Sequence, residues 1–357
     1  MSHKIFKTAI TGLLILTAAA FIGCSGDDDN IKTSAVNQVV ADISDSIAEK
    51  VVDAAFASAV PEPTLLSGKH QGAIMDIADL LIVDSVAYAV FDGGLIVYDF
   101  KIDTFQTISS GEKINAIAMH DGQIYVGGKN LFIVHDNGLE TVALKFESEI
   151  KALHSFNGQL MIGTGQGLYV RSADNYDVVR EDIDVRAMVT DESGLWVGTN
   201  GQSMYRMEGG QFKKRFLLRD STIFDKVNTL DFNNGYVYVG TDEALYIFDG
   251  GAWETLTIED GLPSNTIRDI DASGWVIYVA TEAGVIAYYN GDFMPARRLE
   301  DKVVNSVQKF HGKLIVGTDS EGLLMKSGAF LKTLVGPNDG GDEPVRPADE
   351  AFTMFNN

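Results

Sequence analysis

One pattern of apolar and polar positions recurs along most of the chain. Each copy holds a short apolar strand, a turn with glycine, a second strand that is rich in aromatic residues and ends near Gly-Thr, and a Gly-Leu pair that opens a third strand. One equivalent position in the second strands is held by Val90, Gly127, Gly163, Gly198, Gly240, Ala280 and Gly317. The spacings between these positions are 37, 36, 35, 42, 40 and 37 residues. The chain therefore contains seven internal repeats.

Each repeat predicts four short strands and no helix. Four strands at about 3.3 Å per residue, with their turns, use about 35–45 residues, which is the size of one β-propeller blade. Second strands such as Ile124–Val126 are apolar on both faces, which is typical of a sheet packed between two others. Radial closure also leaves only short exposed edges. We therefore predict an all-β fold, a seven-bladed β-propeller of four-stranded blades over residues 64–335.

The N-terminus has the pattern of a bacterial secretion signal. Lys4 and Lys7 precede an apolar run over residues 9–22, which is short for a membrane-spanning helix. The only cysteine, Cys24, follows Gly23 at the end of this run, an arrangement that resembles the lipoprotein box. Residues 1–23 are thus predicted to be a lipoprotein signal peptide, and Cys24 the lipidated residue. An ordinary signal peptide or an uncleaved anchor are the alternatives.

Two acidic segments flank the repeats. Residues 24–63 form a predicted tether in which apolar residues at helical spacing indicate an amphipathic helix that ends before Pro61. Residues 336–357 form a predicted disordered, acidic tail. By analogy with enterobacterial sorting, Ser25 after the cysteine favours the outer membrane, on either its periplasmic or its cell-surface face.

The fifth and sixth repeats are similar to a known repeat. Trp253 closes one blade, the segment 260–265 links it to the next, and the next blade carries Gly284 and the segment 289–293. These features resemble the two-component-regulator propeller repeat of extracytoplasmic sensor domains and free-standing propellers. The resemblance implies a propeller that senses or binds. A propeller lipoprotein of the outer-membrane protein assembly machinery is similar in architecture only, and implies a structural subunit as an alternative.

Composition narrows the classes of partner. The sequence has 28 Lys+Arg against 50 Asp+Glu and a net charge of −22, which argues against nucleic acid, since phosphates are held mainly by basic residues. A single cysteine excludes a disulfide framework, a cysteine-based zinc site and a haem attachment motif. We expect no cofactor. The expected partners are the membrane, through the lipid anchor, and an envelope protein or a glycan or anionic ligand.

The start of the innermost strands supplies a candidate ligand ring at the mouth of the central channel. Alignment of these strands places Met75, Asn115, Lys151, Arg186, Asn228, Arg268 and Asn305 at one position. Amide and cationic donors suit carboxylate, phosphate or sugar hydroxyl groups. The alternative is structural: these side chains would tie neighbouring blades together or bind channel water.

Catalytic and metal signatures are not found in the sequence. Acidic and amide residues at the turns between second and third strands, such as Asp242 and Glu282, are interpreted as turn residues rather than calcium ligands. His120, His154 and His311 are predicted at the opposite end of the channel from the ring. The predicted function is a lipid-anchored, extracytoplasmic, non-catalytic module that binds a ligand or protein. A propeller hydrolase or lyase acting on polysaccharide or lactone is an alternative.

Overall fold

The computed structural model describes residues 76–136, 138–172, 175–202, 204–208, 211–216 and 226–336. Within these ranges every regular element is a β-strand, as the repeats predict. No helix among them is long and apolar enough to cross a membrane. The predicted signal peptide, Cys24, the tether and the tail after Gly336 lie outside the described residues.

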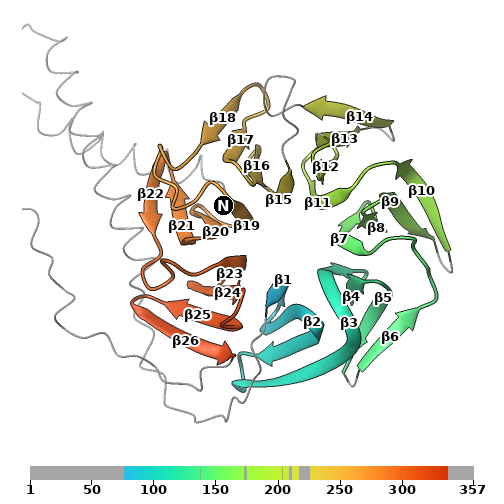
Figure 1. Ribbon diagram of the computed structural model, residues 1–357, viewed down its shortest axis with the longest axis horizontal. Coiled ribbons are helices and arrows are strands. Elements are labelled where there is room, and N and C mark those ends of the chain that lie inside the picture. Colours follow the sequence, from blue (N-terminus) through green and yellow to red (C-terminus); the bar gives the residue numbers. More distant parts are fainter. Residues whose placement is uncertain are drawn as a thin grey trace, which may run out of the picture. The chain divides into compact units, whose positions relative to one another are not determined.

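The strands form six hydrogen-bonded sheets, which are arranged around a central axis as the blades of a β-propeller (Figure 1). The first sheet has six strands, β1 (Ile77–Val83), β2 (Val86–Asp99), β3 (Thr104–His120), β4 (Gln123–Gly128), β5 (Leu131–His135) and β6 (Gly138–Val142). Each of the other five sheets has four antiparallel strands in chain order.

The four-stranded sheets use strands of four to seven residues. The second sheet has β7 (Ile150–Phe156), β8 (Gln159–Thr164), β9 (Gly167–Ser172) and β10 (Asn175–Glu181), and the third has β11 (Val185–Thr190), β12 (Leu195–Thr199), β13 (Met204–Glu208) and β14 (Gln211–Phe216). The fourth has β15 (Val227–Asn233), β16 (Tyr236–Thr241), β17 (Leu245–Phe248) and β18 (Trp253–Leu256). The fifth has β19 (Ile267–Asp271), β20 (Ile277–Thr281), β21 (Gly284–Tyr289) and β22 (Asp292–Pro295), and the sixth has β23 (Val304–Phe310), β24 (Lys313–Thr318), β25 (Leu323–Ser327) and β26 (Phe330–Val335). We call β1, residues 114–120 of β3, β7, β11, β15, β19 and β23 the inner strands, because they surround the axis (Figure 1).

The prediction of seven separate four-stranded blades is wrong, because the described residues form six sheets and the first two sequence repeats share one of them. Strand β3 is unbroken over its 17 residues. Its first part pairs with β2 as far as Lys113, opposite Asp92, and its last part pairs with β4. The register between β2 and β3 shifts over residues 110–112, and pairing resumes at Lys113, so the two repeats stay in one sheet.

The recurrent Gly-Thr pair has two structural roles. A Cβ atom at Gly240 would lie 2.6 Å from Cγ2 of Ile267 in the next inner strand, so glycine permits the close spacing of these sheets. The hydroxyl of Thr241 accepts a hydrogen bond from the N–H of Ala244 and donates one to its carbonyl oxygen, which closes the tight turn. The same close approach is made by Gly127, Gly163, Gly198 and Gly317. Thr164 and Thr281 close the same turn, and Thr318 closes a turn that is one residue longer.

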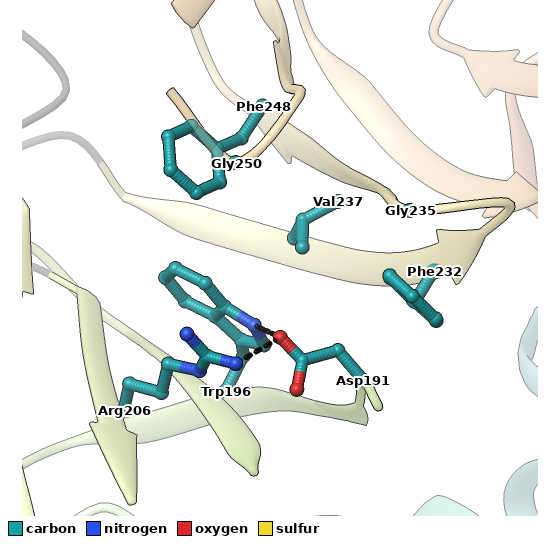
Figure 2. A pocket seen from close by; sticks show the side chains of 8 residues that line it. All are labelled: Asp191, Trp196, Arg206, Phe232, Gly235, Val237, Phe248 and Gly250. Carbon is teal, nitrogen blue, oxygen red and sulfur yellow. Dashed lines mark hydrogen bonds and ion pairs between the residues drawn. The ribbon is translucent and has the colours of Figure 1, made fainter. Parts of the chain in front are cut away.

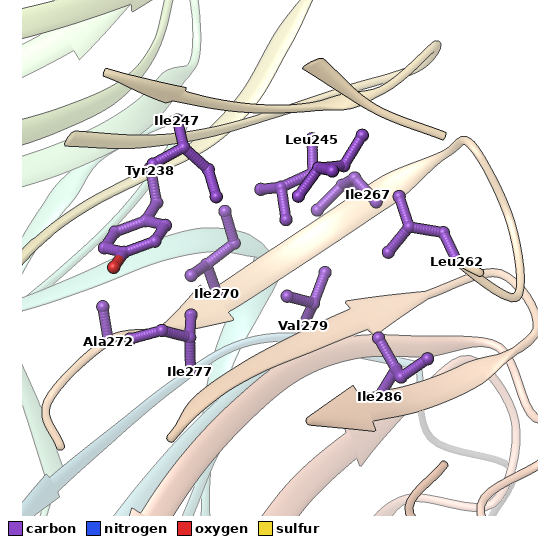
Figure 3. Packing of buried hydrophobic residues seen from close by; sticks show 11 residues of the cluster. Tyr238, Leu245, Ile247, Leu262, Ile267, Ile270, Ala272, Ile277, Val279 and Ile286 are labelled. Carbon is purple, nitrogen blue, oxygen red and sulfur yellow. The ribbon is translucent and has the colours of Figure 1, made fainter. Parts of the chain in front are cut away.

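The hydrophobic core lies in layers between neighbouring sheets. Figure 3 shows the layer between the fourth and fifth sheets, where Leu245 and Ile247 meet Ile267, Ile270 and Val279. These five side chains are at most 5% exposed, which explains why the strands are apolar on both faces. The aromatic residues that recur in the second strands also pack between sheets: Tyr125, Trp196, Tyr238 and Tyr278 are buried, and Tyr88 is partly buried.

The ring closes where the first sheet meets the last. Ile77 of β1 packs with Ile315 of β24 in one apolar cluster. The side-chain amide of Gln308 accepts a hydrogen bond from the N–H of Ile82 at 2.8 Å and donates one to the carbonyl of Leu80 at 2.9 Å. Strand β26 completes the last sheet. Within the described residues, the two ends of the repeat array are thus joined by side chains and apolar packing.

Candidate functional site

The six residues of the predicted ligand ring occupy one equivalent place at the start of the inner strands. The pairing of each inner strand with its neighbour shifts register there: Ile114 pairs with Gly128 and Ala116 with Gly127, so Asn115 is skipped. A β-bulge of this kind re-aims the side chain that it carries. The same shift occurs at Lys151, Arg186, Asn228, Arg268 and Asn305.

The seventh position of the ring was misaligned in the sequence. In β1 the register shifts between Ile77 and Asp79, so the equivalent residue is Ala78. Met75, which the alignment placed there, lies outside the described residues. The structure therefore places six polar side chains and one methyl group at the seven bulges.

The three asparagines of the ring hold neighbouring inner strands together. Asn115 Nδ2 donates a hydrogen bond to the carbonyl of Ile150 at 3.1 Å, and Asn228 Nδ2 donates to the carbonyl of Ile267 at 2.9 Å. Asn305 Nδ2 donates to Asp76 Oδ1 at 2.8 Å. Each contact reaches the segment that begins the next inner strand, so each of these amides links neighbouring blades through Nδ2.

The cationic residues of the ring lie against carboxylates. Lys151 Nζ is 2.7 Å from Asp184 Oδ1, and a guanidinium nitrogen of Arg268 is 2.6 Å from Glu282 Oε1. Both pairs keep a fifth or more of their side-chain surface exposed. The cations of the predicted ligand ring are therefore paired with carboxylates. We call the six ring residues and these carboxylates the channel rim.

Asp242 accepts hydrogen bonds from Asn228 and Lys226 at another place on this rim. Burial alone would raise its pKa, but hydrogen bonds from Asn228 and Lys226, together with the charges of Lys226 and Arg186, hold the pKa of this carboxyl below its usual range. Asn228 Nδ2 lies 2.7 Å from Asp242 Oδ1. The carboxylate is thus ionised at neutral pH and neutralises cations from two inner strands.

The rim is more acidic where the first and last sheets meet. The pKa of Asp76 is raised by burial and by the nearby charge of Asp319, against the opposing effect of Lys113. Sequence reasoning treated Asp319 and Asp242 as turn residues and overlooked Asp76 and Asp184. The available signal was their place, directly before an inner strand, where a loop must end at the rim.

A second set of carboxylates lies on the inner strands, after the bulge positions in the chain. The edge of each inner strand that faces the axis has no neighbouring strand, so its N–H groups need other acceptors. Asp79 accepts a hydrogen bond from the N–H of Ile117 at 3.1 Å, and Asp269 accepts one from Val307 at 2.9 Å. The same contact with the next inner strand is made by Asp231 to Ala272 and by Asp271 to Lys309.

Burial raises the pKa of three of these carboxyls. It brings the pKa of Asp79 and that of Asp231 to about 6, although backbone N–H donors act in the opposite direction. The pKa of Asp269 is raised well above its usual value, first by burial and also by the charge of Asp79. Sequence reasoning missed these residues. The signal was an aspartate within an otherwise apolar inner strand, as in the stretch 267–271.

Histidines occupy the other end of the inner strands, as predicted. His120 Nδ1 lies 2.9 Å from the hydroxyl of Ser155, and His154 Nε2 lies 2.7 Å from that of Thr190. Each contact again joins one inner strand to the next. Burial lowers the pKa of His154 to about 4, so the imidazole of His154 is neutral at physiological pH. Across the described ranges, no three His, Cys, Asp or Glu side chains are placed to hold a metal ion together.

Comparison with known proteins identifies the fold. No family model and no curated protein matches the sequence. The WD40 β-propeller domain of Doa1 matches with a TM-score of 0.56 and 16% identity, over 73% of this chain and 95% of that chain. The computationally designed Ika8 protein matches with a TM-score of 0.51 and 13% identity, over 73% of this chain and 100% of that chain.

An extracellular domain is also among the similar structures. The extracellular domain of the hybrid two-component system BT4673 from B. thetaiotaomicron matches with a TM-score of 0.48 and 15% identity. The match covers 70% of this chain and 44% of that chain, so this chain spans less than half of that domain. At such identities the similarity concerns the propeller fold, and the residues of the rim are this chain's own.

Proposed function

We propose that this protein is a non-catalytic binding module of the bacterial cell envelope that recognises its ligand at the channel rim. The observation that carries the proposal is the convergence of six bulge side chains, from Asn115 to Asn305, on one rim. Residues far apart in sequence thereby present donors and acceptors around a single axis.

The charge pairing favours a neutral, polyhydroxylated ligand, such as a glycan, over an anion. Lys151 and Arg268 each already contact a carboxylate, so an anion would compete with Asp184 or Glu282 for its donor. A sugar hydroxyl both donates and accepts a hydrogen bond, and can join a cation–carboxylate pair without displacing either partner. The rim therefore suits a ligand that carries many hydroxyl groups.

Two variants test binding at the rim. The exposed pair between Arg268 and Glu282 contributes about 0–1 kcal/mol to stability, so Arg268→Ala is expected to leave the melting temperature nearly unchanged. The glycan for the test is first identified on an array with the wild-type protein. The double variant Arg186→Ala/Arg268→Ala should bind this glycan about tenfold more weakly or worse, which corresponds to about 1.4 kcal/mol. Isothermal titration calorimetry measures the loss.

Lys101→Ala is the matched control, because Lys101 is an exposed cation at the turn after β2, away from the rim. It should bind the glycan as the wild type does. An array without any glycan bound by the wild type, or equal affinity in all variants, would refute glycan recognition at this site.

We also propose that Cys24 anchors the module to the outer membrane. Each buried acyl methylene contributes about 0.8 kcal/mol, so several acyl chains on one cysteine hold a protein firmly to a bilayer. Cys24→Ser is therefore expected to move the protein from the membrane fraction to the soluble fraction and to abolish labelling by an alkyne fatty acid. Ser34→Ala serves as the control. Membrane retention of unlabelled Cys24→Ser protein would contradict lipid anchoring.

A further inference from the structure

At two places, an aromatic residue of a second strand meets a long side chain from the third strand of the next repeat. Tyr125 of β4 meets Arg171 of β9, whose guanidinium carbon lies 5.3 Å from the centre of the ring. Arg171 Nη1 also donates a hydrogen bond to the hydroxyl of Tyr125 at 2.7 Å. Trp196 meets Phe248 of β17, with ring centres 5.9 Å apart, beside the cavity drawn in Figure 2. The propeller thus contains a built example of an arginine on a tyrosine.

The equivalent place beside Tyr88 is held by a short side chain. Strand register puts Val134 of β5 where β9 has Arg171, because each lies three residues after the leucine that pairs with the glycine of the preceding strand. Tyr88 and Val134 pack against the same apolar cluster. Valine is too short to cover the tyrosine ring, and among the described residues no cation or second aromatic ring takes its place.

An open groove of about 660 Å³ lies beside Tyr88. It is near the turn between β3 and β4, at the other end of this inner strand from the rim. Apolar side chains line it together with Tyr88, namely those of Ile124, Val134 and Leu139. Neither the rim nor the proposed function uses these residues.

The groove carries negative charge. Asp136 and Glu140 line it and are exposed, and no lysine or arginine of the described residues does so. Glu140 Oε2 lies 2.8 Å from His135 Nε2, which leaves Asp136 as the carboxylate without a nearby cation in the lining. Burial raises the pKa of Tyr88, and the charges of Asp136 and Asp84 raise it further. Both carboxylates therefore act at the hydroxyl of Tyr88 and would attract a cation placed there.

An arginine side chain fits this combination of groups. A guanidinium can stack on a tyrosine ring and donate hydrogen bonds to a hydroxyl and a carboxylate, whereas the ammonium of lysine is a compact point charge. The methylene stem of arginine suits the apolar lining, because such stems pack along apolar surface while the charged end stays in water.

The surroundings favour an arginine within a protein over the free amino acid. Free arginine carries a carboxylate, which Asp136 and Glu140 would repel. Gly122 and Gly138 border the groove, and a Cβ atom at either would meet nothing within 4 Å, so a main chain can approach. The apolar lining also extends beyond Tyr88 to Leu139, which leaves room for the residue beside the arginine.

We propose that this groove binds an arginine side chain of a partner protein, together with an apolar residue next to it. The guanidinium stacks on the ring of Tyr88 and pairs with Asp136, as Arg171 of this chain stacks on Tyr125. The neighbouring apolar side chain contacts Leu139. The site makes the propeller a scaffold for a protein partner, independently of a ligand at the rim.

The test uses the peptide acetyl-Gly-Arg-Leu-Gly-amide and measures its affinity for the wild-type protein by calorimetry. Replacing its arginine by citrulline, which keeps the shape but not the charge, should weaken binding about tenfold or more. Lysine in its place should weaken binding about fivefold, since it cannot make the planar contacts. No binding of the arginine peptide, or equal affinity for any two of these peptides, would overturn the assignment to arginine.

Free arginine separates the two sources of a guanidinium. It should bind about tenfold more weakly than the peptide, because its carboxylate meets those of the groove. Equal or tighter binding of free arginine would identify the amino acid as the ligand and overturn the assignment to a protein segment.

Variants of the groove complete the test. Val134→Arg puts a guanidinium where the next repeat has Arg171, so it should fill the groove and abolish binding of the peptide. Tyr88→Leu should weaken binding about fivefold by removing the ring. Asp136→Asn, at an exposed position that leaves the packing intact, should weaken it about threefold.

Asp292→Asn is the matched control, because it removes an exposed carboxylate from the fifth sheet. It should bind the peptide as the wild type does. Unchanged affinity in Val134→Arg or in Asp136→Asn would refute the site, whether or not the rim binds its glycan.

Discussion

Gly240→Val is expected to lower the free energy of unfolding by about 3 kcal/mol, at the upper end of the cost of overpacking a core. A Cβ atom at this position would lie 2.6 Å from Cγ2 of Ile267 and 2.6 Å from Cγ2 of Thr229, whereas non-bonded carbons prefer about 3.5–4.0 Å. The neighbouring inner strand would have to move, because Ile267 is fully buried. Urea unfolding monitored by circular dichroism measures the loss.

Two further variants separate this effect from the general cost of replacing glycine. Gly240→Ala should cost less than the valine variant, since Ala280 holds the equivalent place in β20 and is fully buried. At Gly138, in β6, a Cβ atom meets nothing within 4 Å, so Gly138→Val should be nearly neutral. If Gly240→Val is as stable as Gly138→Val, the close spacing of the sheets does not depend on glycine.

The buried carboxylates are expected to make the propeller more stable as the pH falls from about 7 to about 5. The pKa of Asp79 and that of Asp231 are about 6 in the folded protein and near 3.8 in the unfolded chain. Between these values the folded state binds more protons than the unfolded state, so the free energy of unfolding rises as the pH falls. Asp269, whose pKa is also raised, acts in the same direction.

His154 opposes this trend. Its pKa is lowered from 6.5 to about 4, so between these values the unfolded chain binds the extra proton and stability falls as the pH falls. The contribution of a carboxyl is therefore best measured as a difference between two proteins. From about pH 7 to about pH 5, the wild type should gain about 1 kcal/mol relative to Asp231→Asn, and more than that relative to a variant with all three aspartates exchanged.

Asparagine retains one acceptor oxygen but places an NH₂ group against the second N–H donor, so these variants are also less stable at every pH. The pH slope is independent of that constant loss, and single variants suffice if the triple variant does not fold. Asp249→Asn is the control. Asp249 is exposed and its pKa is lowered from 3.8, so it stays ionised over the range and the slope should not change. Identical slopes in wild type and Asp231→Asn would contradict the raised pKa.

The propeller could be predicted from the sequence because its repeats carry local rules. Short apolar strands, glycine-containing hairpins and the Gly-Thr turn each depend on neighbouring residues, and together they specify a four-stranded unit. The alignment of Asn115 with Asn305 and the residues between them was correct for the same reason. At the chain's first repeat the local pattern was weaker, and the alignment chose Met75 where the register has Ala78.

The number of separate sheets could not be read from the repeats. Whether the first two repeats share a sheet depends on the pairing of Lys113 with Asp92, which are 21 positions apart. A repeat count reports how often a unit recurs. It does not report whether two units stay hydrogen-bonded to each other.

The sequence alone determined the fold class, the positions that face a neighbouring sheet and the six equivalent polar residues at the start of the inner strands, because strand pattern and turn chemistry act over a few residues. Only the tertiary structure decided what those residues contact. It paired Lys151 with Asp184, set Asp79 against the N–H of Ile117, and brought Arg206 and Phe248 to one cavity. Such contacts depend on how closely the sheets pack around the axis. Radial packing joins residues about one repeat apart, and a shift of about 1 Å is enough to make or break a hydrogen bond.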